Sequence, residues 1–482
     1  MDQLADTRPA TERVLAVDLD GTLVRSDMLY ESFWAAMAQD WRTPWIALRG
    51  LSGGKAVLKA RLAAMALPDP ATLPYDAAVL DEIRHWHEAG GRVALVTAAD
   101  SRVALAIADH LDLFDEVHAS DGLTNLKGPA KAAWLRERYG AGGYVYAGDS
   151  TADLAVWQEA GDALTVGAAP ALRARVEGLH PKARHLSPPE PVLPAALRAA
   201  RPHQWLKNML IFFPMVAAHD FNLTAFAMGV LAFVSFSLVA SSVYLLNDLL
   251  DIASDRAHPR KRMRPLAAGM LPLKTGMMLI PLLLLAGIGV GLFLPPVFLL
   301  VLAGYYALTV AYSLWLKRRP IIDICALASL YTMRVIAGGA AAGIGLSVWL
   351  LAFSAFLFFA LAAVKRQAEL VDMMQRGVDE AAGRGYRVSD LPLVTQMATA
   401  SGFVAVLVLM LYLNEPEVLV LYSHPVLLWA ACLAMLYWIS RMVLVASRGK
   451  MDDDPTVYAA RDRVSLTIVA LIAALFIAAK VL

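Results

Sequence analysis

Cysteine is scarce in this chain, and its scarcity excludes two classes of structure. The 482 residues include two cysteines, Cys325 and Cys432, and each lies inside an apolar segment. A disulfide framework and a cysteine-based zinc cluster are therefore excluded. A surplus of one charge is also missing, because 43 Lys and Arg balance 42 Asp and Glu to a net charge of +1. We therefore expect no nucleic-acid surface.

Long apolar runs are missing from the first two hundred residues and dominate the rest. Residues 1–13 are polar and lack the basic region and apolar core of a secretory signal, so we expect the amino-terminal part to stay in the cytoplasm. The whole chain is 58% hydrophobic, with a mean hydropathy of +0.53. These values exceed those of an ordinary soluble protein. The sequence therefore predicts a soluble domain followed by a polytopic membrane domain.

The apolar runs and a proline-rich stretch set the domain boundaries. We expect a soluble domain at 1–190, a linker at 191–203 and an all-helical membrane domain at 204–482. Hydropathy predicts about nine membrane segments. They lie at 205–221, 225–246, 273–293, 296–315, 322–342, 347–365, 393–413, 424–446 and 464–482.

Basic residues in the membrane domain are concentrated in alternate loops. The loops after the second, fourth, sixth and eighth segments carry them, and the intervening loops carry none. By the positive-inside rule these basic loops are cytoplasmic, and the carboxyl end lies on the opposite side of the cell (inner) membrane. The soluble domain and the loops at 247–264 and 365–372 are then on the same, cytoplasmic side.

The soluble domain has the alternation of short strands and helices that predicts a parallel α/β sheet. Three predicted strands end at Asp18, Thr97 and Gly148-Asp149, and polar residues at such strand ends bind ligands in open α/β sheets. The long insertion at about 27–88, between the first two strands, is expected to form a helical cap.

Phosphoryl transfer explains the polar residues at these strand ends. Asp18 is suited to attack phosphorus, while Asp20 is placed to protonate the leaving alcohol and then to activate water. Thr97 would bind a phosphoryl oxygen, and Lys131 or its neighbour Lys127 would neutralise charge. The expected Mg²⁺ ligands are Asp18, Asp20, Asp149 and Asp153.

The order of these motifs resembles that of the haloacid dehalogenase-like (HAD) phosphatase superfamily. All four of the family's motifs occur in sequence, at 18–22, Thr97, Lys131 and 148–153. The resemblance implies a Rossmann-like fold, an aspartyl-phosphate intermediate, Mg²⁺ and a cap at the family's first insertion point. A domain that binds Mg²⁺ without turnover is the alternative.

An acidic run at the end of the second membrane segment predicts a second Mg²⁺ site. Asn247, Asp248, Asp251 and Asp255 would share one face of a helix, where three carboxylates repel one another unless cations neutralise them. The basic string at 256–264 follows at once. Metal and basic side chains together suit a substrate with several phosphates.

This run, with Arg264-Pro265-Leu266 and Gly269 downstream, resembles the UbiA superfamily of intramembrane prenyltransferases. That resemblance implies about nine helices around a polar cavity that faces the cytoplasm. Ordinary members hold a prenyl diphosphate with a second aspartate-rich loop. Here the corresponding loop, at 365–372, has more cationic and fewer acidic side chains.

The departure resembles the decaprenyl-phosphate phosphoribosyltransferase branch of that superfamily. The resemblance implies 5-phosphoribosyl 1-diphosphate as donor and a polyprenyl phosphate as acceptor, with a role in building the cell envelope. The expected substrate-binding residues are Asn247, His258, Lys261, Arg262, Arg264, Lys317, Asp323, Arg334, Lys365 and Arg366. Of these, Lys317, Lys365 and Arg366 are expected to hold the acceptor phosphate. Arg334, deep in the fifth segment, is expected to line the cavity as a phosphate ligand or to form a structural pair.

Together these patterns predict a bifunctional, Mg²⁺-dependent membrane enzyme. The membrane domain would transfer phosphoribose to the lipid phosphate, with Asp248, Asp251 and Asp255 as its catalytic carboxylates, and the HAD-like domain would dephosphorylate the product. An aromatic prenyltransferase with a prenyl diphosphate donor is one alternative. A transporter or lipid-binding scaffold with a regulatory phosphatase is another, and the sequence leaves open whether the protein is an oligomer.

Overall fold

The computed structural model describes residues 13–121, 126–379, 385–420, 422–451 and 454–481. Contacts divide the chain into two units. The first contains residues 1–200 and also 244–280, and the second contains 201–243 and 281–482. The segment around the acidic run thus groups with the amino-terminal domain. Each unit is described by itself below.

A six-stranded parallel sheet forms the centre of the first unit. Its order is β3-β2-β1-β4-β5-β6. The strands are β1 (Val14–Val17), β2 (Arg92–Asp100), β3 (Glu116–Ser120), β4 (Tyr144–Gly148), β5 (Asp162–Thr165) and β6 (Arg184–His185). Buried apolar side chains fill β1, β4 and most of β2, with Tyr144 and Tyr146 in β4, as expected for a parallel sheet that helices cover on both faces. The predicted α/β class and its three strands are confirmed, except that β2 continues past Thr97.

The register aligns the carboxyl ends of the central strands. Val17 of β1 lies opposite Leu95 of β2 and Ala147 of β4. The residues that follow these three positions therefore meet at one edge of the sheet. The flanking helices are α5 (Ser101–Leu111), α6 (Pro129–Tyr139), α7 (Leu154–Glu159) and α8 (Pro170–Leu179), with the turn η3 (Thr151–Asp153) before α7.

The insertion between β1 and β2 is helical, as predicted. It comprises α1 (Met28–Gln39), α2 (Thr43–Leu51), α3 (Lys55–Met65), η2 (Pro70–Thr72) and α4 (Ala77–Glu88). Asp27 begins α1 by accepting the N–H of Leu29 with its side chain. A small apolar core of its own, which includes Ala36, Leu58 and Leu62, joins α1 to α3. The predicted linker at 191–203 contains a short helix, α9 (Val192–Ala199).

Eight helices of the described residues are long and apolar enough to cross a membrane. They are α11 (Leu223–Leu250), α13 (Leu273–Gly291), α14 (Pro296–Leu314), α15 (Ile322–Ala342), α16 (Val348–Gln375), α17 (Leu391–Leu413), α19 (Leu427–Ser447) and α21 (Arg463–Val481). The segment predicted at 205–221 folds instead as the 3-10 helix η4 (Pro202–Phe212) and the short α10 (Phe213–Ala217). The short helices α12 (Ile252–Ala257), α18 (Pro416–Leu419) and α20 (Pro455–Arg461), with the turns η5 (Lys261–Met263), η6 (Leu316–Arg318) and η7 (Val388–Asp390), lie in the connections.

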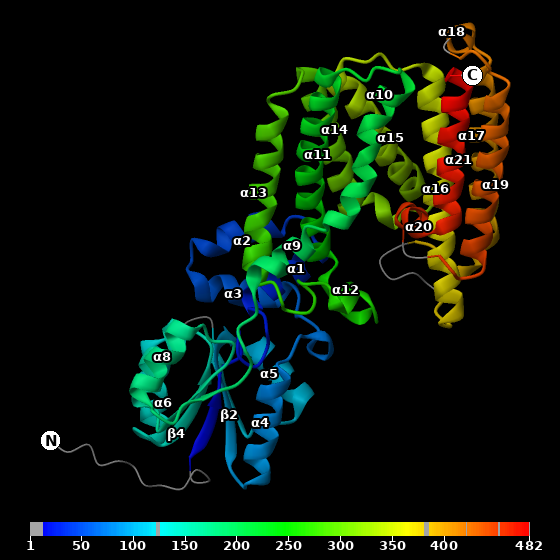
Figure 1. The fold of residues 1–482 in the computed structure, drawn as a ribbon. Coiled ribbons are helices and arrows are strands. Elements are labelled where there is room, and N and C mark those ends of the chain that lie inside the picture. Colours follow the sequence, from blue (N-terminus) through cyan, green and yellow to red (C-terminus); the bar gives the residue numbers. More distant parts are fainter. Residues whose placement is uncertain (1–12, 122–125, 380–384, 421, 452–453, 482) are drawn as a thin grey trace. The chain divides into compact units, whose positions relative to one another are not determined.

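Small residues allow close packing in the second unit. A Cβ atom on Gly338 of α15 would lie 1.9 Å from the carbonyl oxygen of Ile211 in η4. Only glycine permits that approach. Elsewhere in this unit α16 packs along α17, and α19 packs against both α17 and α21, around a buried apolar cluster that includes Phe358, Leu428 and Cys432 (Figure 1).

Candidate functional site

Three carboxylates meet at the carboxyl edge of the sheet in the first unit. Asp18 follows β1, Asp149 follows β4 and Asp153 lies in η3, and each offers an oxygen within 4.8 Å of the others. Burial, followed by repulsion from Asp153 and Asp18, raises the pKa of Asp149 well above its usual range. Such a group stays ionised only beside a cation, and oxygen ligands of this kind suit Mg²⁺. The residues present therefore fit the expected metal. Asp20 lies outside this group.

Lys131, in the first turn of α6, supplies the positive charge beside these carboxylates. Its Nζ lies 2.8 Å from Asp18 Oδ1 and donates to the Tyr146 hydroxyl at 2.9 Å. Tyr146 in turn donates to Asp153 Oδ1 at 3.0 Å. The side chain of Lys131 is only 2% exposed. The structure thus brings Lys131, rather than Lys127, to the nucleophile. Tyr146 is a participant that sequence reasoning missed.

Asp20 is placed for proton transfer. Its Oδ1 accepts the backbone N–H of Met28 at 2.7 Å. Burial, together with the nearby carboxylates of Asp27 and Asp18, raises the pKa of Asp20 to about 7. A carboxyl group with that pKa can give and take a proton near neutral pH. Gly21, directly after Asp20, turns the chain with a φ of +73°, and a Cβ there would lie 2.3 Å from Asp149 Oδ2.

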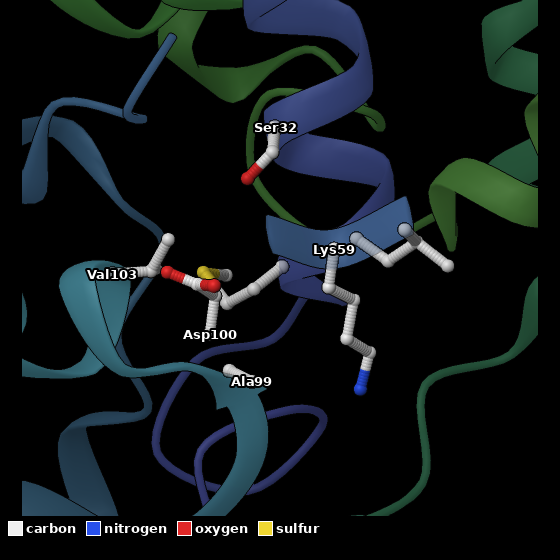
Figure 2. Close-up of a pocket in the computed structure, with 7 residues that line it drawn as sticks. Ser32, Lys59, Ala99, Asp100 and Val103 are labelled. Carbon is white, nitrogen blue, oxygen red and sulfur yellow. The ribbon is translucent and has the colours of Figure 1, made fainter. Parts of the chain in front are cut away.

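A small pocket lies between the cap and the sheet (Figure 2). Its lining comes from α1, α3, the end of β2 and α5: Met28, Leu29, Ser32, Lys59, Ala99, Asp100 and Val103. Lys59 was not predicted, and it brings a cation toward Asp20 and Asp27. Burial lowers the pKa of Lys59 despite these carboxylates. Thr97 is fully buried, and its hydroxyl accepts the N–H of Ala99 at 3.0 Å.

The acidic run of the membrane part bends where the sequence predicted one helix. α11 ends at Leu250 and α12 begins at Ile252, so Asp251 lies at the break. Backbone hydrogen bonds nevertheless continue across it, from Asp251 N–H to Asn247 and from Asp255 N–H to Asp251. The expected common face survives, since Asn247 Nδ2 also donates to Asp251 Oδ2 at 3.0 Å.

Arg264 lies between two carboxylates of this run. Its Nη1 is 3.2 Å from Asp248 Oδ1 and 2.5 Å from Asp255 Oδ2. Both aspartates are 3% exposed. Burial raises the pKa of Asp255 to about 6, although Arg264 opposes the rise. The pair of carboxylates thus binds a guanidinium cation, and carboxylate oxygens are also of the kind that Mg²⁺ prefers.

Apart from Arg256, which is buried, the other basic residues after the run are His258, Arg260, Lys261 and Arg262, and they are half-buried or exposed. The ring Nδ1 of His258 accepts the N–H of Arg260 at 3.2 Å and that of Lys261 at 3.4 Å, which fixes the turn. Lys261 is half-buried and Arg262 is exposed. The structure therefore gives His258 a backbone partner and leaves its proposed substrate role as a prediction.

The second unit contains a basic cluster around one buried carboxylate. Asp454 forms ion pairs with Lys207 and, at 3.5 Å, with Lys365, and its Oδ1 accepts the hydroxyl of Thr456 at 2.6 Å. Although burial opposes it, the two ammonium groups hold the pKa of Asp454 well below its usual range. Sequence reasoning singled out Lys365 but gave no role to Lys207 or Asp454.

Arg366, adjacent to Lys365, has a carboxylate partner instead of an open position. It forms a buried ion pair with Asp323 of α15 and a second pair with Glu369. Tyr386 donates to Asp323 Oδ1 at 2.6 Å. The pair joins α15 to α16, which contains the whole of 365–372, and the substrate-binding roles of Asp323 and Arg366 stay predictions. Lys317, in η6, is buried.

Arg334 lies deep in α15 and is buried at 4% exposure. Its Nε donates to Asn208 Oδ1 at 2.8 Å, and its Nη2 donates to the Tyr305 hydroxyl at 3.2 Å. It also donates to the carbonyl of Leu330 one turn earlier and lies over the rings of Tyr305 and Phe236. These contacts favour the structural pair over the phosphate ligand.

Comparison with known proteins identifies both parts of the chain. Residues 209–466 match the UbiA prenyltransferase family, and residues 15–158 match the haloacid dehalogenase-like hydrolases. An uncharacterised protein, y4nM, of Sinorhizobium fredii is 38% identical over 96% of this chain and 90% of its own length. Nodulation protein NoeC of Azorhizobium caulinodans is 39% identical over 56% of this chain and 87% of its own.

A third relative carries a name that describes a reaction. The decaprenyl-phosphate phosphoribosyltransferase of Mycolicibacterium smegmatis is 42% identical over 189 residues, which are 38% of this chain and 59% of that protein. The similarity therefore covers only part of each chain.

Proposed function

Because the chain belongs to the UbiA prenyltransferase family and carries a HAD-like domain, we propose that it is a bifunctional membrane enzyme that makes and then dephosphorylates a phosphoribosyl lipid. Its membrane part would transfer 5-phosphoribose from phosphoribosyl diphosphate to a polyprenyl phosphate. Its soluble domain would remove the 5-phosphate from the product. Both sites would face the cytoplasm, and the basic composition of the adjoining loops supports that orientation.

The basic cluster of the second unit is the observation that carries the transferase proposal. Residues 365–372, which the sequence predicted as a loop, lie within α16, and Lys365 contributes an ammonium group that shares a single carboxylate, Asp454, with Lys207. Two cations beside one carboxylate favour an anionic ligand such as a phosphate monoester, whereas a second Mg²⁺-bound diphosphate would need several carboxylates. The partial similarity to decaprenyl-phosphate phosphoribosyltransferases supports the same donor and acceptor.

The transfer exchanges one bond at the anomeric carbon of the ribose. An oxygen of the lipid phosphate attacks that carbon, the bond to the diphosphate oxygen breaks, and diphosphate leaves with the electron pair. Asp248, Asp251 and Asp255 would hold Mg²⁺, which neutralises charge on the departing diphosphate. The attacking phosphate is already anionic, so no strong base is required.

The phosphatase reaction takes place on Asp18 in two steps. Asp18 attacks phosphorus, and Asp20 gives its proton to the departing ribose hydroxyl as the phosphorus–oxygen bond breaks. Asp20 then takes a proton from water, which attacks the phosphoaspartate and releases inorganic phosphate. Lys131 neutralises charge on Asp18 and the phosphoryl group. Mg²⁺ at Asp18, Asp149 and Asp153 would supply further charge neutralisation.

The full chain, purified in detergent with Mg²⁺, provides the test. Labelled phosphoribosyl diphosphate and polyprenyl phosphate should yield diphosphate, a ribosylated lipid and then inorganic phosphate. Asp251→Asn should stop diphosphate release, whereas Asp18→Asn should stop only phosphate release and accumulate the phosphorylated lipid. Reaction of a prenyl diphosphate with an aromatic acceptor would replace this assignment with conventional prenyl transfer, and undiminished transfer in Asp251→Asn would refute the site.

A further inference from the structure

A buried ion pair joins the cap of the HAD-like domain to the segment that follows the acidic run. Arg256 comes directly after Asp255, and its guanidinium donates to Glu31 of α1 from Nη1 at 3.0 Å and from Nη2 at 2.7 Å. The two side chains are 5% and 2% exposed. Both residues belong to the first unit. The contact is bidentate, which fixes direction as well as distance.

Further contacts hold the two segments together. Arg256 Nε donates to the carbonyl of Ala267 at 3.0 Å, so the same side chain also fixes the loop that follows. In that loop Gly269 has a φ of +71°, and a Cβ there would lie 2.6 Å from the carbonyl oxygen of Arg25. α12 also packs against η2 of the cap. The contact is therefore an extended interface built around Arg256.

Orientation in the membrane does not explain this arrangement. A positive-inside loop needs only exposed basic residues, and Arg260 and Arg262 provide them. Burying an ion pair carries a desolvation penalty that excellent geometry must offset, so such a pair is better evidence for a fixed arrangement than for stability. The Ser26 hydroxyl donates a further hydrogen bond to Glu31 Oε1, which helps to offset the burial of that carboxylate.

The ion pair lies close in sequence to Asp255 of the acidic run and, through helix α1, to Asp20 of the phosphatase site. On one side Arg256 is adjacent to Asp255, which Arg264 contacts. On the other side Glu31 is one helical turn from Met28, whose N–H donates to Asp20 at 2.7 Å. Ser32, the next residue on α1, lines the pocket in Figure 2. One helix thus carries the partner of Arg256, a backbone N–H that donates to the proposed general acid Asp20, and part of the lining of this pocket.

We propose that Arg256 and Glu31 form a clamp through which the acidic segment of the membrane part positions helix α1, and with it Asp20, in the phosphatase site. Occupation of the acidic segment by a diphosphate then changes the order of α1, because Arg264 must share Asp248 and Asp255 with the ligand's cations. Arg256 and Glu31 are positioning residues and touch no substrate. The proposal rests on the phosphatase half of the proposed function and not on the identity of the lipid.

The first experiment compares the Arg256→Gln variant of the full chain with the unmodified full chain, both in detergent with saturating Mg²⁺. Hydrolysis of p-nitrophenyl phosphate should lose about tenfold or more in kcat with little change in KM, because α1 no longer holds Asp20. Hydrogen exchange at the amides of residues 28–39 should become faster. Arg184→Gln is the matched control, since Arg184 pairs with Glu82 at 3.0 Å elsewhere on the same domain. It should change neither readout.

A double variant separates the clamp from general destabilisation. Glu31→Gln/Arg256→Gln removes both charges and leaves no unpaired buried ion, so it should fold if the single variant does not. Its kcat should be no lower than that of either single variant, because one interaction has been removed once. Normal kcat and normal exchange of α1 in the double variant would overturn the positioning role.

The second experiment tests the connection between the sites with inorganic diphosphate as the probe. At constant Mg²⁺, diphosphate should alter exchange of residues 28–39 in the unmodified chain and leave it unaltered in Arg256→Gln. An equal response in both proteins, or none in the unmodified chain, would overturn the connection. These outcomes do not depend on whether the chain uses phosphoribosyl diphosphate as a donor. Failure of the clamp proposal can therefore be distinguished from failure of the proposed transferase function.

Discussion

Lys131→Met is the substitution that tests the phosphatase site most directly. Lys131 is buried, lies 2.8 Å from Asp18 Oδ1 and donates to Tyr146 at 2.9 Å. The methionine side chain is nearly as long as the aliphatic part of lysine. The change therefore removes the positive charge and leaves the side-chain volume nearly unchanged. Lys127, a lysine four residues earlier, is the matched control.

The magnitude follows from what the ammonium group does. Removing one positioned donor from a developing negative charge typically costs about 10²–10³ in kcat, or about 2.7–4 kcal/mol of transition-state stabilisation. Lys131 is buried and contacts the nucleophile itself, so we expect a loss toward the upper end of that range. Lys127→Met should stay within about threefold of the unmodified chain, because no contact with Asp18 joins it to the reaction.

The assay is single-turnover and steady-state hydrolysis of p-nitrophenyl phosphate by the full chain. Diphosphate release from the membrane site is measured in the same preparations, and it should be unchanged in both variants. Lys131→Arg should be faster than Lys131→Met but slower than the unmodified chain, since arginine keeps the positive charge but not the geometry of the ammonium group. A large loss in Lys127→Met together with normal turnover in Lys131→Met would refute the reasoning.

Three further predictions concern stability, strain and pH. Gly21→Ala should reduce phosphate release more than tenfold while transfer persists, because a Cβ at a φ of +73° would lie 2.3 Å from Asp149. Asp323→Ala should lower the free energy of unfolding by about 3–5 kcal/mol, since it leaves Arg366 buried without its Asp323 partner; Asp323→Leu/Arg366→Met should cost much less in thermal unfolding. Although burial opposes it, hydrogen bonds from three neighbours lower the pKa of Glu116 from 4.5 to about 2. Its stabilisation is therefore complete above pH 4.5 and lost between pH 4.5 and 2, and Glu116→Gln should remove that part of the acid unfolding profile.

Local patterns made much of the fold predictable. Buried strands that end in Asp18 and Asp149 imply a common sheet edge, because parallel strands align their carboxyl ends, and the register confirms it. Apolar runs likewise predicted the long helices. The segment at 205–221 formed η4 and α10 instead, and its Pro202 and Pro214 stand at positions where helices commonly begin.

Long-range partners were not predictable, since no periodicity relates them. Sequence reasoning predicted Lys131 as the lysine of the third motif and left Lys127 as an alternative, and the fold brings Lys131 to Asp18. The guanidinium group of Arg366 has the charge of a phosphate ligand, but in the structure it forms an ion pair with Asp323. Charge alone does not say whether a cation meets a ligand or a neighbouring carboxylate.

The sequence by itself determined the membrane and soluble parts, the order of the phosphatase motifs and the presence of an acidic run beside a basic string. Hydropathy and spacing act over a few turns of chain, and one sequence displays them in full. Tertiary structure decided the bend at Asp251, the place of Arg264 between two carboxylates and the pairing of Glu31 with Arg256. Those outcomes depend on which distant groups share a buried volume, because burial makes an unpaired charge costly and selects its partner.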